Sequence, residues 1–179
     1  MLSHLYSYFG MRFARFQFRS EIDPPRSMTS FLRNAKYILI TLPVGYEEAN
    51  AASDALQKIR DQMGNAHLTL IHTGTRATSL AGSTRCDVVR LDPEDINRFS
   101  LPRRSLLKRI GTHPYDVAID LNLDFVLHTA YICRATSADV RVGFVRDASE
   151  TFFNVQIRAA KRATPKATYD KLADTLAMF

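Results

Sequence analysis

The sequence has 179 residues, of which 46% are hydrophobic, and its net charge at neutral pH is +6. This length and apolar content suffice for one well-packed core, so we expect a single globular domain. No apolar run approaches the length that a bilayer crossing requires. The first stretch also lacks the short apolar region and small-residue cleavage site of a secretory signal. These features argue against a transmembrane protein and against a secreted one.

The positive charge is concentrated near the N-terminus. Residues 1–36 contain six basic and two acidic side chains, a net charge of +4, which leaves +2 for the other 143 residues. Residues 1–20 contain no acid, and a helix there would gather on one apolar stripe Leu5, Tyr8, Phe9, Phe13, Phe16 and Phe18. We therefore define residues 1–35 as a basic aromatic extension, with the candidate interaction residues Arg12, Phe13, Arg15, Phe16 and Arg19.

Four roles for this extension stay open. The first is packing on its own domain or on a protein partner, and the second is binding to an anionic membrane surface, as basic amphipathic segments do. The third is organellar targeting, because residues 1–20 contain arginine and serine without acids. The fourth is nucleic-acid binding through aromatic and arginine side chains.

From residue 36 to residue 179, predicted strands and helices alternate. A β-rich apolar run predicts a first strand over 37–42, and apolar residues at three- and four-residue steps predict a helix over 47–63. Further strands are expected over 67–72 and 86–91, with a short helix over 76–81 between them. Asp92, with a proline after it, predicts the start of a helix that breaks near Pro102 and resumes from Leu106 to Gly111.

The second half continues the same alternation. Strands are expected over 115–122 and 140–145, joined by a crossover helix within 123–138. A sixth strand at the sheet edge is expected over 152–157, and a last helix starts at Thr164-Pro165. The pattern predicts an α/β fold, a single Rossmann-like domain. Its open, mainly parallel sheet of about six strands would carry helices on both faces.

Four carboxylates are placed where this fold binds ligands. Glu47 and Glu48 follow the first strand, where a carboxylate can act as a general base or simply favour a helix N-terminus. Asp120 and Asp124 follow the central strand, where they would line a cleft, although Asp120 is also a suitable helix cap.

Several other chemistries lack their motifs. There is no G-x-G-x-x-G turn, no Walker A loop and no G-x-S-x-G elbow, so we expect no dinucleotide or other cofactor and no hydrolase. Cys86 and Cys133 have no motif spacing and are expected to be buried thiols. Such thiols indicate a reducing compartment such as the cytoplasm, with an organellar matrix left open.

No metal site is expected, because no Cys/His cluster has metal-ligand spacing, and His72 and His113 are assigned structural or solvent-exposed roles. A basic run consists of Arg98, Arg103, Arg104, Lys108 and Arg109. It is interpreted as a solvated face or protein interface, with phosphorylated ligands or RNA as the alternative.

Two segments resemble the N-terminal domain of the heptosyltransferase-type glycosyltransferases, the family 9 enzymes with the two-domain GT-B architecture. The first is the strand 38–42 with the loop and helix after it. The second is the strand 116–122 (DVAIDLN), which is followed later in the sequence by RVGF at 141–144. The resemblance implies a Rossmann-like fold over about residues 36–179, and it places Glu48 where the family has an aspartate as catalytic base.

The departures from the family shape the functional prediction. Leu42 replaces a basic residue, Glu47 a glycine, and the lysine after the second motif is absent. The sequence ends about where the family's linker to the nucleotide-sugar-binding domain begins. We therefore predict a degenerate glycosyltransferase-like domain without independent catalysis, which acts as an accessory or interaction subunit of a larger protein assembly. One form of this hypothesis places the assembly at a membrane surface. The alternative is the acceptor half of a split glycosyltransferase with Glu48 as base.

Overall fold

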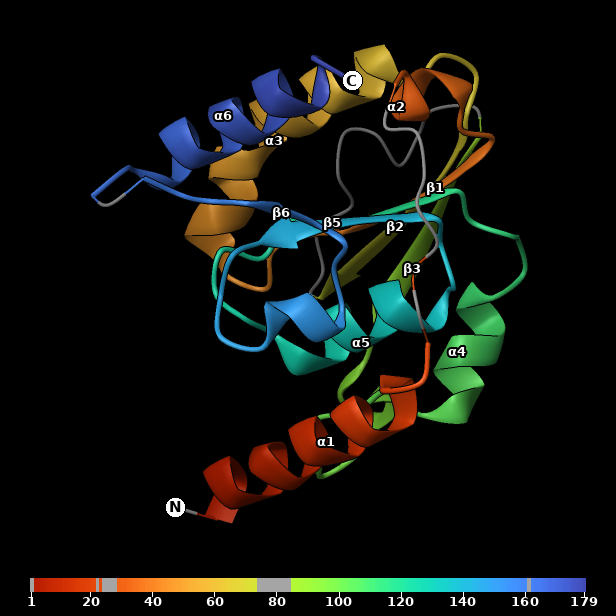
Figure 1. Ribbon diagram of the computed structural model, residues 1–179, viewed down its shortest axis with the longest axis vertical. Coiled ribbons are helices and arrows are strands. Elements are labelled where there is room, and N and C mark those ends of the chain that lie inside the picture. The colour runs from red at the N-terminus through yellow and green to blue at the C-terminus, as the bar shows by residue number, and fades with distance from the viewer. Residues whose placement is uncertain (1, 22, 24–28, 74–84, 161) are drawn as a thin grey trace.

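The computed structural model describes residues 2–21, 23, 29–73, 85–160 and 162–179, and its centre is a six-stranded sheet (Figure 1). The strands lie in the order β3-β2-β1-β4-β5-β6, and each neighbouring pair is parallel. Their bounds are β1 Tyr37–Thr41, β2 His67–Thr73, β3 Cys86–Leu91, β4 Val117–Asp120, β5 Val140–Phe144 and β6 Val155–Ile157. This arrangement confirms the predicted Rossmann-like α/β fold.

Helices cover both faces of the sheet (Figure 1). One face carries α2 (Phe31–Asn34), α3 (Tyr46–Gln62) and α6 (Pro165–Leu176), and the other carries α1 (Leu2–Phe18), α4 (Arg104–Ile110) and α5 (Leu127–Ala135). Side chains alternate between the faces along each strand, so Ile38 and Ile40 join one core cluster and Leu39 joins the other. Burial on both sides explains why the central strands are continuous apolar runs.

The predicted helix starting at Asp92 is wrong. The chain makes only one 3-10 turn, η2 (Pro93–Asp95), although the Asp95 carboxylate accepts a hydrogen bond from the Asp92 amide at 3.1 Å and completes the capping box of a helix start. Asn97 then turns the chain by accepting hydrogen bonds from two later backbone amides. Helical structure resumes only at α4, which matches the predicted second part.

Other predicted bounds shift by a few residues. The crossover helix α5 occupies only the middle of the predicted segment, and β6 is shorter than predicted because Phe152 and Phe153 leave the strand to enter the core. β6 does lie at the sheet edge, as predicted. A second 3-10 turn, η3 (Ser149–Thr151), precedes it. The predicted helix over 76–81 lies outside the described residues.

Residues 2–18 of the extension form the helix α1, in which Leu5, Tyr8, Phe9, Phe13 and Phe16 share one face as predicted, whereas Phe18 lies on another face. The helix buries Gly10, Ala14 and Phe18, which recur every four residues, against the domain. Leu5, Tyr8, Phe9, Phe13 and Phe16 face away from it, with exposed fractions of 50–62%. The helix therefore has two apolar surfaces, of which one is covered.

The structure bears on the predictions about membrane-spanning segments and about the two cysteines. Within the described residues, no helix combines the length and apolarity needed to cross a bilayer. Both cysteines are free thiols, and Cys133 is fully buried while Cys86 is only half-buried. The prediction of burial is therefore confirmed for Cys133 alone. Burial raises the pKa of the Cys133 thiol well above its ordinary value, so it stays protonated and behaves as a small apolar side chain.

Candidate functional site

The middle of the sheet contains the topological switch point. β1 and β4 are neighbours there, and the chain proceeds outward from them in opposite directions, to β2 and β3 on one side and to β5 and β6 on the other. Open α/β sheets bind ligands at the carboxyl ends of such strands. The predicted carboxylates follow these two strands, so this edge is the first candidate site.

Asp120 ends β4 and is buried beneath this edge, with 4% of its surface exposed. Its Oδ1 accepts hydrogen bonds from the Thr41 hydroxyl at 2.8 Å and from the backbone and side-chain nitrogens of Asn122 at 3.0 and 2.6 Å. The Thr129 hydroxyl donates to its Oδ2 at 2.9 Å. Burial raises the pKa of Asp120, and these hydrogen bonds oppose the rise. The carboxylate therefore joins β1, β4 and α5 from inside the fold.

This buried cluster also holds the loop before α3. The Asn122 side-chain oxygen accepts a hydrogen bond from the Val44 amide at 2.9 Å, while its amide nitrogen donates to Asp120. Asn122 thus connects the end of β4 to the loop that leads into the first turn of α3. Asp120 is thus linked to the Val44 backbone through Asn122.

The other three predicted carboxylates lie nearer the surface. Glu47 is exposed and Glu48 is half-buried in the first turn of α3, while Asp124 is exposed in the loop before α5. Burial raises the pKa of Tyr169, and the charges of Glu48 and Asp120 raise it further. The Tyr169 hydroxyl donates to the carbonyl of Leu121, the residue after Asp120, at 2.8 Å. The roles of the four carboxylates in catalysis or in lining a cleft stay predictions.

The described residues also form a shallow hollow of about 300 Å³ at the opposite edge of the sheet. Phe31, Asp116 and Asp139 contribute to its walls at the amino ends of β4 and β5. The Asp116 carboxylate there accepts hydrogen bonds from the backbone amides of Lys36 and Tyr37. The hollow is thus separate from the switch point and from all four predicted carboxylates.

The second candidate site is the outer face of α1, formed by the exposed side chains Leu5, Tyr8, Phe9, Phe13 and Phe16. Arginines border it. The Arg12 guanidinium donates to the Tyr8 hydroxyl at 3.3 Å, and the Arg19 guanidinium lies 4.1 Å from the centre of the Phe16 ring. Arg15 forms an exposed ion pair with Glu150 at 3.6 Å. All five predicted interaction residues therefore lie on or beside α1.

The opposite side of α1 is fixed to the domain by close packing. A Cβ atom built on Gly10 would lie 2.0 Å from the Phe99 carbonyl oxygen, so only glycine permits this approach. The Phe18 ring packs 5.1 Å from the ring of Tyr131, whose hydroxyl donates to the Gln17 side chain at 2.8 Å. Ser7 and Ser100 exchange a hydrogen bond of 2.8 Å. The position of the outer face is thus set by the domain.

Ion pairs fasten the segment after α1. The guanidinium groups of Arg134 and Arg141 are almost fully buried and both bind the Asp23 carboxylate. Arg134 also donates to the Glu21 carbonyl at 3.1 Å. Burial by itself would raise the pKa of Asp23, but the hydrogen bonds from Arg141 and Arg134 outweigh it and hold the pKa below its ordinary value. Sequence reasoning missed this role of Asp23, because its two partners lie 111 and 118 positions away along the chain.

The predicted basic run is partly engaged within the fold. Arg109 donates to the Asp95 carboxylate at 2.8 Å and to the Arg90 carbonyl at 3.0 Å. The Arg98 guanidinium lies against the rings of Tyr6 and Phe99, at 5.7 and 4.9 Å from their centres. These contacts attach η2 to α4 and the Phe99 loop to α1. Binding of RNA or phosphorylated ligands stays an untested alternative.

Comparisons with solved structures bear on the fold. The chain is similar to E. coli heptosyltransferase WaaC with ADP, with a TM-score of 0.58, 14% identity, and coverage of 78% of this chain and 46% of that one. It is also similar to the same enzyme with ADP-2-deoxy-2-fluoro heptose, with a TM-score of 0.56, 13% identity, and coverage of 80% and 49%. The chain thus spans about half the length of the structures that it matches. No family model and no curated protein matches it.

At this level of identity the similarity establishes the fold alone. It confirms the predicted resemblance to part of a heptosyltransferase-type GT-B enzyme as a structural likeness. The similarity does not transfer the activity, the substrates or the partners of those enzymes to this chain.

Proposed function

We propose that this protein is a glycosyltransferase-like domain without independent catalysis, which serves as an accessory or interaction subunit of a larger protein assembly. It docks through the outer face of α1. The observation that carries the proposal is a row of five large apolar side chains, each at least half exposed, on a helix whose other side is fixed to the domain. Monomeric proteins seldom expose contiguous apolar surface of this kind without a partner for it.

The composition of the outer face favours a protein partner over a lipid surface. Aromatic residues and arginine are enriched in protein interfaces and lysine is depleted there. The outer face combines tyrosine and phenylalanine with Arg12 and Arg19, and the first lysine of the sequence is Lys36. The arginines beside the rings suit a partner that presents carboxylates around an apolar centre.

The absence of independent catalysis is supported by the switch point. The Asp120 carboxylate is buried and accepts four hydrogen bonds from within the fold, so it has little capacity left for a substrate. Leu42 stands where the resembled family has a basic residue, and Glu48 where it has an aspartate. Fold likeness alone does not supply the chemistry that these positions lack.

The test is a pair of matched surface variants. Phe16 and Tyr46 have nearly equal exposed fractions, 62% and 63%, but only Phe16 belongs to the outer face. Each is replaced by serine, and each protein is purified with its bound partner under native conditions. We expect Phe16→Ser to weaken the complex at least tenfold, as loss of an aromatic interface residue does, and Tyr46→Ser to leave it intact. Equal retention by both variants would contradict docking through α1.

The second candidate is an acceptor-binding half of a split heptosyltransferase-like enzyme, and the position of Glu48 favours it. This carboxylate is half-buried in the first turn of α3, at the switch-point edge. Glu47, its exposed neighbour, provides the control. Turnover of an ADP-linked heptose is measured with the native partner present, in Glu48→Gln and in Glu47→Gln. A general base predicts a 10²- to 10⁴-fold loss in the first variant alone. Equal rates in the two variants would reject Glu48 as the base.

A further inference from the structure

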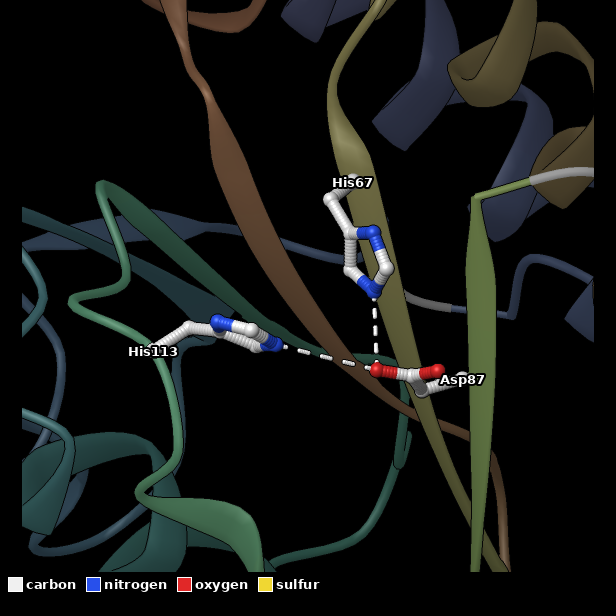
Figure 2. A group of neighbouring side chains, drawn as sticks. All are labelled: His67, Asp87 and His113. Atoms are coloured by element: carbon white, nitrogen blue, oxygen red, sulfur yellow. Dashed lines mark hydrogen bonds and ion pairs between the residues drawn. The ribbon is translucent and has the colours of Figure 1, made fainter.

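Three side chains with metal-binding atoms converge at the amino ends of β2 and β3, across the sheet from the switch point (Figure 2). His67 is the first residue of β2, Asp87 is the second residue of β3, and His113 belongs to the loop between α4 and β4. Figure 2 shows the two imidazole rings approaching the Asp87 carboxylate from different directions. None of these residues takes part in the function proposed above.

The ring nitrogens converge on one oxygen atom. The Nε2 atom of His67 lies 2.8 Å from Asp87 Oδ2, and the Nε2 atom of His113 lies 3.8 Å from the same oxygen. The three ligand atoms all lie within 4.8 Å of one another. Two imidazole nitrogens and a carboxylate oxygen thus face a common point from three separate chain segments.

The sheet register dictates this meeting. Thr69 of β2 pairs with Asp87 of β3, and paired residues of neighbouring strands point to the same face. His67 precedes Thr69 by two residues and therefore shares that face. Tyr37 of β1 pairs with His67 and adds an aromatic ring beside it, with the ring centres 6.0 Å apart. Two of the three converging groups are therefore held on the rigid part of the fold.

The loop that carries His113 is also fixed. Its imidazole stacks on the Tyr37 ring, with the centres 4.6 Å apart and the planes inclined by 12°. Two residues later, the buried Tyr115 hydroxyl bridges Ile110 of α4 and Thr69 of β2, at 2.9 and 3.0 Å. His113 is thus placed by its own stacking and by the anchoring of the chain after it. This support amounts to pre-organisation of a binding site.

We propose that His67, Asp87 and His113 form a binding site for a divalent first-row transition-metal ion, with Zn²⁺ as the favoured ion. Two imidazoles and one carboxylate suit such ions, whereas Mg²⁺ and Ca²⁺ prefer oxygen ligands throughout. Metal–ligand bonds of ~2.0–2.1 Å in a tetrahedral site separate the ligand atoms by about 3.3 Å. The observed separations of 2.8 and 3.8 Å lie on either side of that value. The separation of the two histidine nitrogens is at most 4.8 Å, so side-chain movements of about 1–1.5 Å bring all three ligand atoms to the spacing of a tetrahedral site.

The site has three protein ligands and remains open to solvent. The side chains of His67 and His113 are 27% and 30% exposed, and that of Asp87 is 56% exposed. A hydrated ion can therefore reach the ligands, and water can complete its coordination. Three protein ligands with an open fourth position are the arrangement of catalytic zinc sites, where the ion lowers the pKa of bound water. Binding would also tie the loop at His113 to the edge strand β3.

The experiment uses the full chain without any histidine tag. Isothermal titration with Zn²⁺ is expected to give one ion per chain with a dissociation constant in the micromolar range or below. Co²⁺ as a substitute ion should give the visible absorption bands of a four- or five-coordinate site with nitrogen ligands. Zn²⁺ at a hundredfold excess over its dissociation constant should raise the melting temperature by roughly 5–10 °C.

Single substitutions separate a metal site from a hydrogen-bonded cluster. His67→Gln and His113→Gln each remove one ligand and should weaken Zn²⁺ binding at least tenfold. His72→Gln makes the same change near the other end of β2 and should bind Zn²⁺ like the parent, with circular dichroism verifying the fold of every variant. Absence of stoichiometric binding by the parent would overturn the proposal. Equal binding by the His113 and His72 variants would also overturn it.

Discussion

Replacing Gly10 by alanine tests the docking of α1, because the substitution should stabilise a free helix but destabilise a helix packed as in this structure. In a free helix, replacing an interior glycine by alanine stabilises the helix by about 0.5–1 kcal/mol. In this structure the new Cβ atom would lie 2.0 Å from the Phe99 carbonyl oxygen and 3.2 Å from the Leu127 side chain. The first contact is with backbone, so no side-chain rotation relieves it. The helix must instead shift by more than about 1 Å, which forfeits the packing of Ala14 and Phe18.

Overpacking of this kind costs about 1–3 kcal/mol, which exceeds the gain in helix propensity. We therefore expect Gly10→Ala to destabilise the protein by about 1–2 kcal/mol and to lower its melting temperature by roughly 2–8 °C. Circular dichroism measures the melting, because the chain has no tryptophan to serve as a fluorescent probe. Phe13→Ala, on the outer face, is the control and should change the stability by less than about 0.5 kcal/mol. A Gly10→Ala protein more stable than the parent would refute the packing of α1 against residue 99.

Three further predictions concern buried charge. Asp23→Asn should lower the free energy of unfolding by about 1–3 kcal/mol, because two buried guanidinium groups lose their carboxylate partner. It should also speed amide hydrogen exchange over residues 2–18, and unchanged exchange would contradict the anchoring role of Asp23. Asp120→Asn should lower the free energy of unfolding, measured with urea, by a similar ~1–3 kcal/mol. The control is Asp124→Asn at an exposed position, which should leave that free energy almost unchanged. Burial lowers the pKa of His128 below 6.5, so its contribution to stability is full above pH 6.5 and is lost as the pH falls through the folded-state pKa. The melting temperature should therefore drop between pH 7.5 and 5, and less steeply in His128→Gln, whereas identical slopes would count against this assignment.

The sheet could be predicted from sequence because its strands carry a strong local signal. Residues 37–41 and 117–120 are apolar runs buried on both faces, and each is followed by a segment with the length of a helical crossover. The segment after Asp92 failed as a prediction for a local reason. Its capping residues are those of a helix start, but the Asp92–Asp95 box closes after one turn and Asn97 redirects the chain. Capping signals specify where a helix begins and leave its length open.

The faces of α1 and the histidine cluster depend on information outside any local window. The helix docks through Gly10 and Ala14, since small residues permit close approach, so the large aromatic residues that dominate hydrophobic periodicity marked the opposite face. His67, Asp87 and His113 are separated by 20 and 26 positions and match no ligand spacing, so only the parallel register brings them together. The sequence did place Glu48 and Asp120 at one edge, because strand ends in this fold share an edge.

The account's central claim is that the outer face of α1 holds this domain in a protein assembly. The most direct measurement is native mass spectrometry of the untagged protein from its source, for the parent and for the Phe16→Ser and Tyr46→Ser variants. The account predicts a stoichiometric complex with a partner protein in the parent and in Tyr46→Ser, and a free chain in Phe16→Ser. A parent that is monomeric, or a complex that survives Phe16→Ser unchanged, would contradict it.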